Sequence, residues 1–248
     1  MTDVQREPTI AALLSRAQDD PNIRGLVLAG SGARGMRTEH SDLDVYVVLD
    51  DADGQKTTRT PEIDAIVVTL GELRELAPPP GDGGGWWFRY SFADARVLLD
   101  RTHGELPDLL RAQATLTDDE VAAALDSYLD GYLNFYYRSL KSDREGRLLE
   151  RRLDAVESVS WLLWTVFALH GRIRPYNKYL QYELEARPLR PAWSGLLDDL
   201  VHLMHDGDVD AQRRLFRLVL ADAPDRGQGH VVDGWGAELG LMRGRMAP

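Results

Sequence analysis

The sequence predicts an α+β domain, with a mixed sheet and flanking helices, followed by an all-α helical bundle. Branched apolar runs of strand length occur only in the first half of the 248-residue chain. After about residue 115, amphipathic helical patterns with capping and glycine stop signals take their place. We therefore expect one domain over residues 1–115 and a second, helical domain over residues 116–248.

The first domain is expected to begin with a short amphipathic helix over residues 9–18. Residues 78–85 read Pro-Pro-Pro-Gly-Asp-Gly-Gly-Gly, which predicts a loop because proline and glycine interrupt helices and strands. The sequence does not indicate a role for that loop. Apolar runs predict four strands, over residues 24–30, 45–49, 64–70 and 96–99.

The second domain shows helix start and stop signals. Thr117 and Glu120 have the spacing of a capping box, which predicts that a helix begins there. A second helix is expected over residues 148–170, stopped by Gly171. Three further helices are predicted, starting at Pro175 and Pro191 and covering residues 209–220.

The overall composition restricts the kind of protein that this can be. A formal net charge of −11 with no segregated basic patch disfavours nucleic-acid binding and suits a small cationic substrate. The chain contains no cysteine, which excludes disulfides and thiolate metal sites. No apolar run reaches the roughly 20 residues that span a bilayer, and the N-terminus does not resemble a signal peptide. We expect a cytoplasmic protein that binds neither nucleic acid nor membrane; no pattern indicates its oligomeric state.

The most informative stretch joins a glycine-serine turn to a pair of carboxylates. Gly30 and Ser31 follow an apolar run, and Asp42 and Asp44 open the next one. Residues i and i+2 of a strand point to the same face, so Asp42 and Asp44 can together hold two divalent ions about 3.5–4 Å apart. Backbone N–H groups of the glycine turn can bind a phosphate beside them. This combination favours phosphoryl or nucleotidyl transfer.

An alternative interpretation treats the same glycines as a dinucleotide-binding fingerprint. The pattern Gly30-x-Gly32-x-x-Gly35 has the required spacing, and Asp50 lies near the position of the acid that binds a ribose. That fold needs a helix between its first two strands, and only residues 33–41 are available for it. The interpretation is the weaker one because those residues contain few apolar side chains.

The segment Ala29-Gly30-Ser31, followed after ten residues by Asp42-Leu43-Asp44-Val45, resembles the signature of the DNA polymerase beta-type nucleotidyltransferase superfamily. The fuller string Gly30-Ser31-x-Ala33-Arg34-Gly35 is similar to its minimal and antibiotic-modifying branches. The resemblance covers about residues 20–110, and the layout of the helical half is similar to the C-terminal bundles of aminoglycoside nucleotidyltransferases. It implies a nucleotidyltransferase-like fold with a helical domain that binds the substrate.

The resemblance also implies a metal and nucleotide site in the first domain. Asp42 and Asp44 would bind Mg²⁺, with Asp64 as the third carboxylate from a neighbouring strand; Glu62 is the alternative third ligand. Two Mg²⁺ ions would stabilise the attack of a substrate oxygen on the α-phosphorus and the departure of pyrophosphate. The triphosphate of ATP would be held by Gly30, Ser31 and Arg34, although a surface position for Arg34 fits the pattern equally well.

A run of carboxylates in the helical half suggests a general base. Glu150, Asp154 and Glu157 share one face of the predicted helix over residues 148–170. In aminoglycoside-modifying relatives, a carboxylate of the helical domain deprotonates the acceptor hydroxyl. Glu157 is the first candidate for this base, because burial in the apolar run would raise its pKa, and Asp154 is the second. The alternative is an acidic, solvated helix face.

Lys178 follows the predicted helix start at Pro175 and is expected to contact the triphosphate, since helix N-termini favour anions. The plainer alternative is an exposed lysine that follows a proline at the first helical position. The sequence does not discriminate between these two roles.

Together these residues predict the transfer of a nucleoside monophosphate, AMP from ATP, to a hydroxyl of a small molecule. A cationic, aminoglycoside-like compound would suit the acidic chain. The expected partners are therefore a nucleoside triphosphate and a small-molecule acceptor. The alternative is an antitoxin-like or regulatory nucleotidyltransferase that modifies a protein partner, although the minimal antitoxins with the same glycine-serine string are much shorter.

Overall fold

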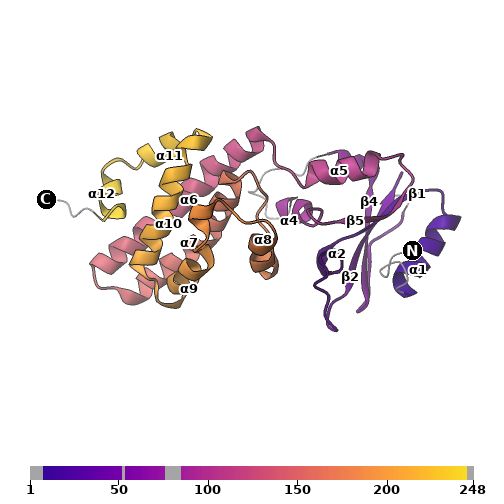
Figure 1. The fold of residues 1–248 in the computed structure, drawn as a ribbon, viewed down its shortest axis with the longest axis horizontal. Coiled ribbons are helices and arrows are strands. Elements are labelled where there is room, and N and C mark those ends of the chain that lie inside the picture. The colour runs from indigo at the N-terminus through magenta and orange to yellow at the C-terminus, as the bar shows by residue number, and fades with distance from the viewer. Residues whose placement is uncertain (1–7, 52–53, 76–84, 245–248) are drawn as a thin grey trace. The chain divides into compact units, whose positions relative to one another are not determined.

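The computed structural model describes residues 8–51, 54–75 and 85–244 of the chain. The chain divides into two compact units, Met1–Pro78 with Asp82–Thr115 and Leu116–Pro248 with Pro79–Gly81. Strands occur in the first unit, whereas the described part of the second is helical (Figure 1). The predicted fold class, an α+β domain followed by a helical bundle, is confirmed. The loop predicted over residues 78–85 lies outside the described residues, apart from Gly85.

The first unit is built on a five-stranded mixed sheet in the order β3-β4-β2-β1-β5. β2 pairs with β4 in parallel, and the pairs β1–β2, β1–β5 and β3–β4 are antiparallel. Four strands lie where apolar runs predicted them, and β3 is a two-residue edge strand too short to leave a pattern. The strands are β1 (Ile23–Leu28), β2 (Leu43–Leu49), β3 (Thr58–Arg59), β4 (Ile63–Thr69) and β5 (Arg96–Asp100).

The antiparallel pairing of β1 and β2 excludes the dinucleotide-binding interpretation, since that fold joins two parallel strands through a helix. The chain between them forms a single helical turn, α2 (Gly30–Arg34), at the position of the predicted glycine-serine turn. This turn ends at Gly35, whose φ of 69° is left-handed and therefore suited to glycine.

Both faces of the sheet are covered, which explains the continuous apolar runs of its central strands. On β1, Leu26 and Leu28 pack with Ile10 of α1 (Pro8–Asp19) on one face. Val27 points to the other face, where it packs with Leu106 of α5 (Glu105–Gln113). Two short helices, α3 (Leu70–Arg74) and α4 (Gly85–Tyr90), complete the unit.

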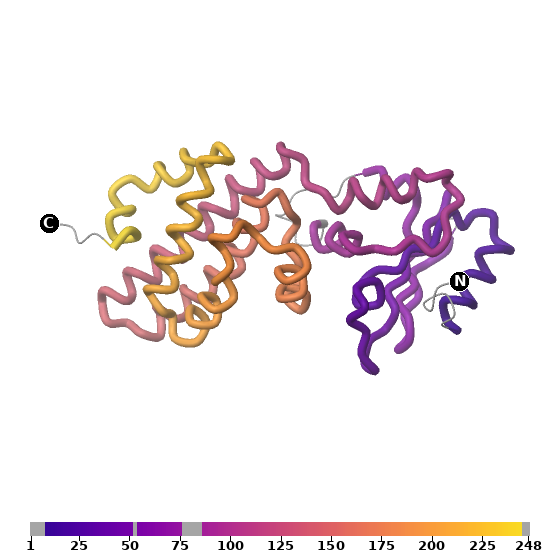
Figure 2. Tube along the Cα trace, in the orientation of Figure 1, coloured from indigo at the N-terminus to yellow at the C-terminus, as the bar shows by residue number. Residues whose placement is uncertain are grey.

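The second unit is organised around two long antiparallel helices, α6 (Asp118–Arg144) and α7 (Leu148–Leu169), which lie side by side (Figure 2). The predicted capping box is present, because Thr117 Oγ1 accepts from the Glu120 backbone N–H and the Glu120 carboxylate accepts from that of Thr117. The remaining helices are α8 (Leu180–Ala186), α9 (Leu196–Asp206), α10 (Val209–Asp222), α11 (Gly229–Asp233) and α12 (Leu239–Met242).

Two predicted helix starts differ from the structure. The segment after Pro175 forms a 3₁₀ turn at Asn177–Tyr179 before α8, and Pro191 opens a second 3₁₀ turn before α9. A proline fits the first turn of either helix type, so the sequence signal marks a start without fixing its kind. No helix within the described ranges has both the length and the apolar character needed to cross a bilayer.

Gly131 explains how closely α6 and α7 approach each other. A Cβ atom at this position would lie 2.3 Å from the Trp161 ring, so the indole of α7 packs directly against the backbone of α6. A glycine inside a helix costs about 1 kcal/mol relative to alanine. The packing of a large aromatic ring offsets that cost.

Candidate metal centre

Three aspartates come together at one end of the sheet. Asp44 lies in β2 and Asp64 lies in β4, and the parallel register makes them direct neighbours. Asp42 precedes Asp44 by two residues and shares its side of the sheet. One carboxylate oxygen of each aspartate lies within 4.8 Å of those of the other two, and all three residues are partly buried. The residues that the sequence predicted as metal ligands are therefore brought together.

The chemistry of this cluster suits a hard divalent cation. Carboxylate oxygens are the ligands that Mg²⁺ prefers, and Mg²⁺ commonly binds through a small number of carboxylates together with phosphate oxygens. Three negative groups at this spacing repel one another, so that a cation between them lowers their electrostatic energy. The donor set fits the magnesium site expected from the sequence.

Glu62, the alternative third ligand, is not part of the cluster. It precedes β4, its side chain is exposed, and its carboxylate accepts a hydrogen bond of 2.9 Å from Thr60 Oγ1. Asp64 instead lies beside Arg59 of β3, whose Nε is 3.4 Å from Asp64 Oδ2. Arg59 was not singled out from the sequence, because a two-residue edge strand has no detectable pattern.

Gly30 leaves the space that the Asp44 carboxylate occupies. It has a φ of 59°, and a Cβ atom built on it would lie 1.8 Å from Asp44 Oδ2. The next residue back, Ala29, donates its backbone N–H to the Asp44 carbonyl at 2.8 Å. The turn and the aspartate are thus fixed together, a role of Gly30 in addition to the predicted phosphate contact. Ser31 follows it in the first turn of α2 and is buried.

Arg34 is buried, so the alternative that placed it on the surface is wrong. Its predicted contact with a phosphate stays a prediction. Its side chain is fully buried, its Nη1 donates to the Gly30 carbonyl at 3.0 Å, and its Nε lies 3.0 Å from Asp94 Oδ2. The guanidinium also donates to the Tyr90 carbonyl and lies 4.8 Å from the centre of the Tyr90 ring. Arg34 therefore holds α2 against the end of α4 and the segment that follows it.

In the second unit, the carboxylates of α7 differ in burial. Glu157 is exposed, so the expectation that it is desolvated is wrong. Asp154 is only 14% exposed, and its Oδ1 lies 3.2 Å from Arg138 Nε. Burial raises the pKa of Asp154 above its usual value, although Arg138 and Arg147 oppose the shift. Asp154, the second candidate, has the environment that was expected of Glu157.

Asp154 forms part of the wall of a pocket of about 310 Å³ between the end of α6 and the start of α7. Three basic and two acidic residues line it, so the pocket does not by itself select a cationic molecule. Its lining residues are Arg138, Lys141, Ser142, Arg147, Glu150, Leu153 and Asp154.

Lys178 lies in the 3₁₀ turn and is exposed, with its Nζ 4.9 Å from the centre of the Tyr179 ring. Its contact with a triphosphate stays a prediction. Near it, Arg174 is buried and donates to Asn177 Oδ1 at 2.7 Å and to Ser160 Oγ at 3.1 Å. Burial lowers the pKa of Arg174 to about 10. This burial could not be predicted from the local sequence, because arginine is normally exposed.

Comparison with known proteins adds little to this geometry. No protein-family model matches the sequence, and no curated protein matches it. Among solved structures, the chain is similar to a nucleotidyltransferase-like protein from Exiguobacterium sibiricum 255-15, with a TM-score of 0.46 and 12% sequence identity. The match covers 94% of this chain and 76% of that one. At this level of similarity, a functional assignment has to rest on the metal centre.

Proposed function

We propose that this protein is a Mg²⁺-dependent nucleotidyltransferase that transfers AMP from ATP to a hydroxyl group of a small molecule. The observation that carries the proposal is the meeting of Asp42, Asp44 and Asp64 on two parallel strands, beside the turn at Gly30. Carboxylates that can hold metal ions next to a glycine turn are the parts that nucleotidyl transfer needs.

In this proposal, the residues of the candidate metal centre and of the neighbouring turn have separate roles. Asp42, Asp44 and Asp64 would hold two Mg²⁺ ions, and Gly30 leaves the space that the Asp44 carboxylate occupies. Bound there, the ions would stabilise the in-line attack on the α-phosphorus and the departure of pyrophosphate. Ser31 and the backbone of its turn would bind the triphosphate, because N–H groups and hydroxyls donate to phosphate oxygens.

The helical unit supplies the acceptor site in this proposal. Asp154 takes the role of general base ahead of Glu157, because burial raises its pKa while Glu157 is exposed. Lys178 adds a positive charge for the triphosphate. A cationic, aminoglycoside-like acceptor is supported by the net charge of −11.

Radiolabelled nucleotides test the proposal directly. The purified chain is incubated with each of the four α-labelled NTPs, Mg²⁺ and a panel of hydroxyl-bearing small molecules that includes aminoglycosides. We expect pyrophosphate release and label on a small molecule, greatest with ATP and absent when EDTA replaces Mg²⁺. Label on a co-purified protein would support the antitoxin-like alternative. The absence of both turnover and Mg²⁺-dependent NTP binding by calorimetry would contradict the proposal.

A further inference from the structure

Exposed large hydrophobic side chains are concentrated on two helices of the second unit. Within the described ranges, eight such side chains are exposed, and six of them lie on α7 and α9. Solvent-exposed apolar side chains are ordinary when scattered singly, whereas a cluster of them marks an interaction surface. The six are Leu148, Leu149, Leu153 and Val156 on α7, and Val201 and Met204 on α9.

The two helices are neighbours in the second unit. Gly207 directly follows α9, and a Cβ atom built on it would lie 3.1 Å from the Arg152 Cα of α7. Arg151 Nη2 also donates to the Asp206 carbonyl at 2.7 Å. The C-terminal end of α9 therefore rests on the N-terminal half of α7, at Arg151 and Arg152.

The exposed residues of α7 follow the spacing of a coiled-coil seam. Leu149, Leu153, Val156 and Ser160 alternate at intervals of four and three residues, as d, a, d and a positions do. Leu149 and Leu153 are 67% and 57% exposed, so this seam is open to solvent. Further along the helix the same face is buried, and at Phe167 the Arg172 guanidinium covers the ring at 5.3 Å.

Charges of opposite sign flank the seam. Arg152 and Glu157 occupy the g and e positions on its two sides, both are exposed, and no ion pair joins either to another described residue. In a parallel pair of helices, a g residue meets the e residue five positions later on the partner helix. Twofold symmetry would therefore form two Arg152–Glu157 pairs. In an antiparallel pair, g residues face g residues and e residues face e residues. Arg152 would then face Arg152, and Glu157 would face Glu157, so that like charges would meet.

We propose that the N-terminal half of α7 is a homodimer interface, in which two copies of this chain pack their α7 helices in parallel. Leu149, Leu153 and Val156 form its apolar centre, and Arg152 of each copy pairs with Glu157 of the other. Val201 and Met204 lie at its rim. An isologous contact of this kind needs only one self-complementary surface. The argument for this interface does not use the proposed enzymatic function, although Leu153 also lines the pocket that contains Asp154. It gives Glu157 a role at its exposed position.

Analytical ultracentrifugation of the full chain, over a wide range of concentrations, tests the dimer. We expect a reversible dimer, weakened at least about tenfold by Leu153→Asp, which places a charge at the centre of the interface. Because Leu153 is exposed, this variant keeps the circular dichroism spectrum and melting temperature of the wild type. A wild-type chain that is monomeric at every concentration would overturn the proposal.

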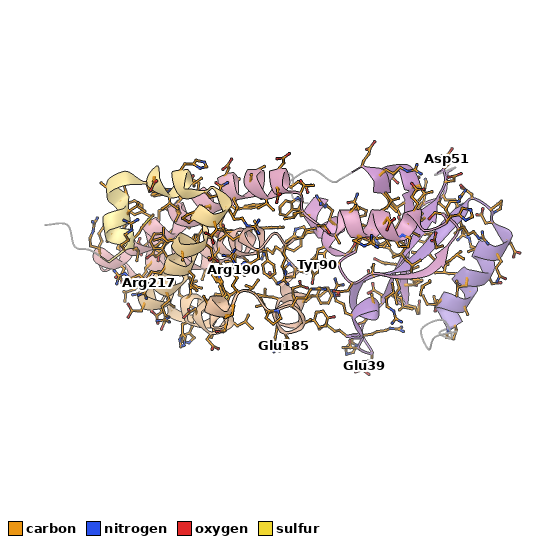
Figure 3. The ribbon with its side chains drawn as sticks, turned by 45° about the horizontal axis from the view of Figure 1, so that its top comes forward. Glu39, Asp51, Tyr90, Glu185, Arg190 and Arg217 are labelled. Carbon is orange, nitrogen blue, oxygen red and sulfur yellow. The ribbon has the colours of Figure 1, made fainter. Side chains whose placement is uncertain are left out.

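Charge reversal tests the parallel register. Arg152→Glu and Glu157→Arg should each weaken the dimer, since each places two like charges at the g–e contact, and the double variant should restore it. Glu185→Arg on α8 and Arg217→Glu on α10 make the same charge changes at other exposed positions and should leave the dimer unchanged (Figure 3). A dimer that is insensitive to both single reversals, or not restored by the double one, rules out this interface.

Discussion

Asp44 and Asp64 are register partners across the parallel pair of β2 and β4, although 20 residues separate them in the chain. Because paired residues of adjacent strands point to the same face, the pairing alone brings the third carboxylate to the first two. A shift of one residue in this register would turn Asp64 to the opposite face. The metal centre therefore depends on the alignment of these two strands.

The first prediction concerns the carboxylate that lies against the glycine turn. Asp44→Asn keeps the shape of the side chain but removes the charge, so nucleotidyl transfer should fall by several orders of magnitude and Mg²⁺ binding should weaken. The melting temperature should stay near that of the wild type or rise, because a like charge leaves the cluster. Asp50→Asn, directly after the far end of β2, is the matched control. Equal losses in the two variants would contradict a specific role of Asp44.

The second prediction separates backbone strain from crowding. Gly30→Ala should displace the Asp44 carboxylate, which can rotate away, and lower Mg²⁺ affinity by about 10–100-fold. Gly35→Ala introduces similar left-handed strain, costing about 1–3 kcal/mol, with no atom within 4 Å of the new methyl group. Both variants should lose stability, but only Gly30→Ala should lose metal affinity in calorimetry. Unchanged Mg²⁺ binding in Gly30→Ala would show that the Asp44 carboxylate is not a ligand.

The third prediction concerns the buried arginine behind the turn. Arg34→Met leaves Asp94 without its guanidinium partner, and should lower the free energy of unfolding by about 3 kcal/mol in urea titration. Arg34→Lys should recover only part of this, because an ammonium group cannot reach Gly30, Tyr90 and Asp94 together. Arg37→Met, an exposed arginine of the same segment, is the control and should be nearly neutral. Equal stability of the Arg34 and Arg37 variants would contradict the clamp.

The fourth prediction concerns the general base. Since burial raises the pKa of Asp154, the acidic limb of kcat/KM should lie above the ordinary aspartate value of about 4. At pH values below that limb, the Asp154 carboxylate is protonated and cannot remove the proton from the acceptor hydroxyl. Asp154→Asn should remove the limb and lower kcat by about 10²–10⁴-fold. Glu157→Gln should keep the limb, and the opposite result would return the role to Glu157.

The fifth prediction concerns a buried ion pair in the second unit. Burial opposes ionisation of Glu183, but hydrogen bonds and charge from Arg187 and Arg172 outweigh it, so the pKa of Glu183 is lowered. The ionised group therefore stabilises the fold above its unfolded pKa, and this contribution is lost as the pH falls through the lowered folded pKa. Glu183→Gln should cost about 3 kcal/mol at neutral pH and much less in acid.

Chemical denaturation over a range of pH values measures this difference. Glu185→Gln, on the exposed side of the same helix, is the matched control and should have little effect at any pH. A Glu183→Gln deficit that does not depend on pH would mean that packing, and not the ion pair, accounts for the loss.

The sequence predicted the strands and the Asp42–Asp44 pair because both depend on local patterns. The apolar runs locate four strands, and the i, i+2 spacing places both carboxylates on one side. Asp64 was preferred over Glu62 on the family resemblance; spacing alone does not separate them, since these residues also have i, i+2 spacing and would share a face. That choice depends on where β4 begins, which the pairing with β2 determines.

The burial of Arg34 and the exposure of Glu157 were missed for a common physical reason. The sequence Gly-Ser-Gly-Ala-Arg has low helix propensity, so only its surroundings hold α2 in a helical turn and bury Arg34. For Glu157, the nearby tryptophans suggested a buried face, but they do not show which neighbouring helix covers each turn. Whether a given side chain is buried depends on the elements that pack against it, and the periodicity of a single helix or strand does not show this.

The pairing of β1 with β5 has a consequence for the order of folding. Gly25 of β1 pairs with Asp100 of β5, so this part of the sheet forms only when two segments far apart in the chain meet. By contrast, α6 and α7 are joined by a short turn. Non-local pairings are slow to form because loop closure costs entropy before any contact repays it. We therefore expect the helical unit to reach its native state first during refolding. Formation of the metal centre would then report the completion of the slower unit.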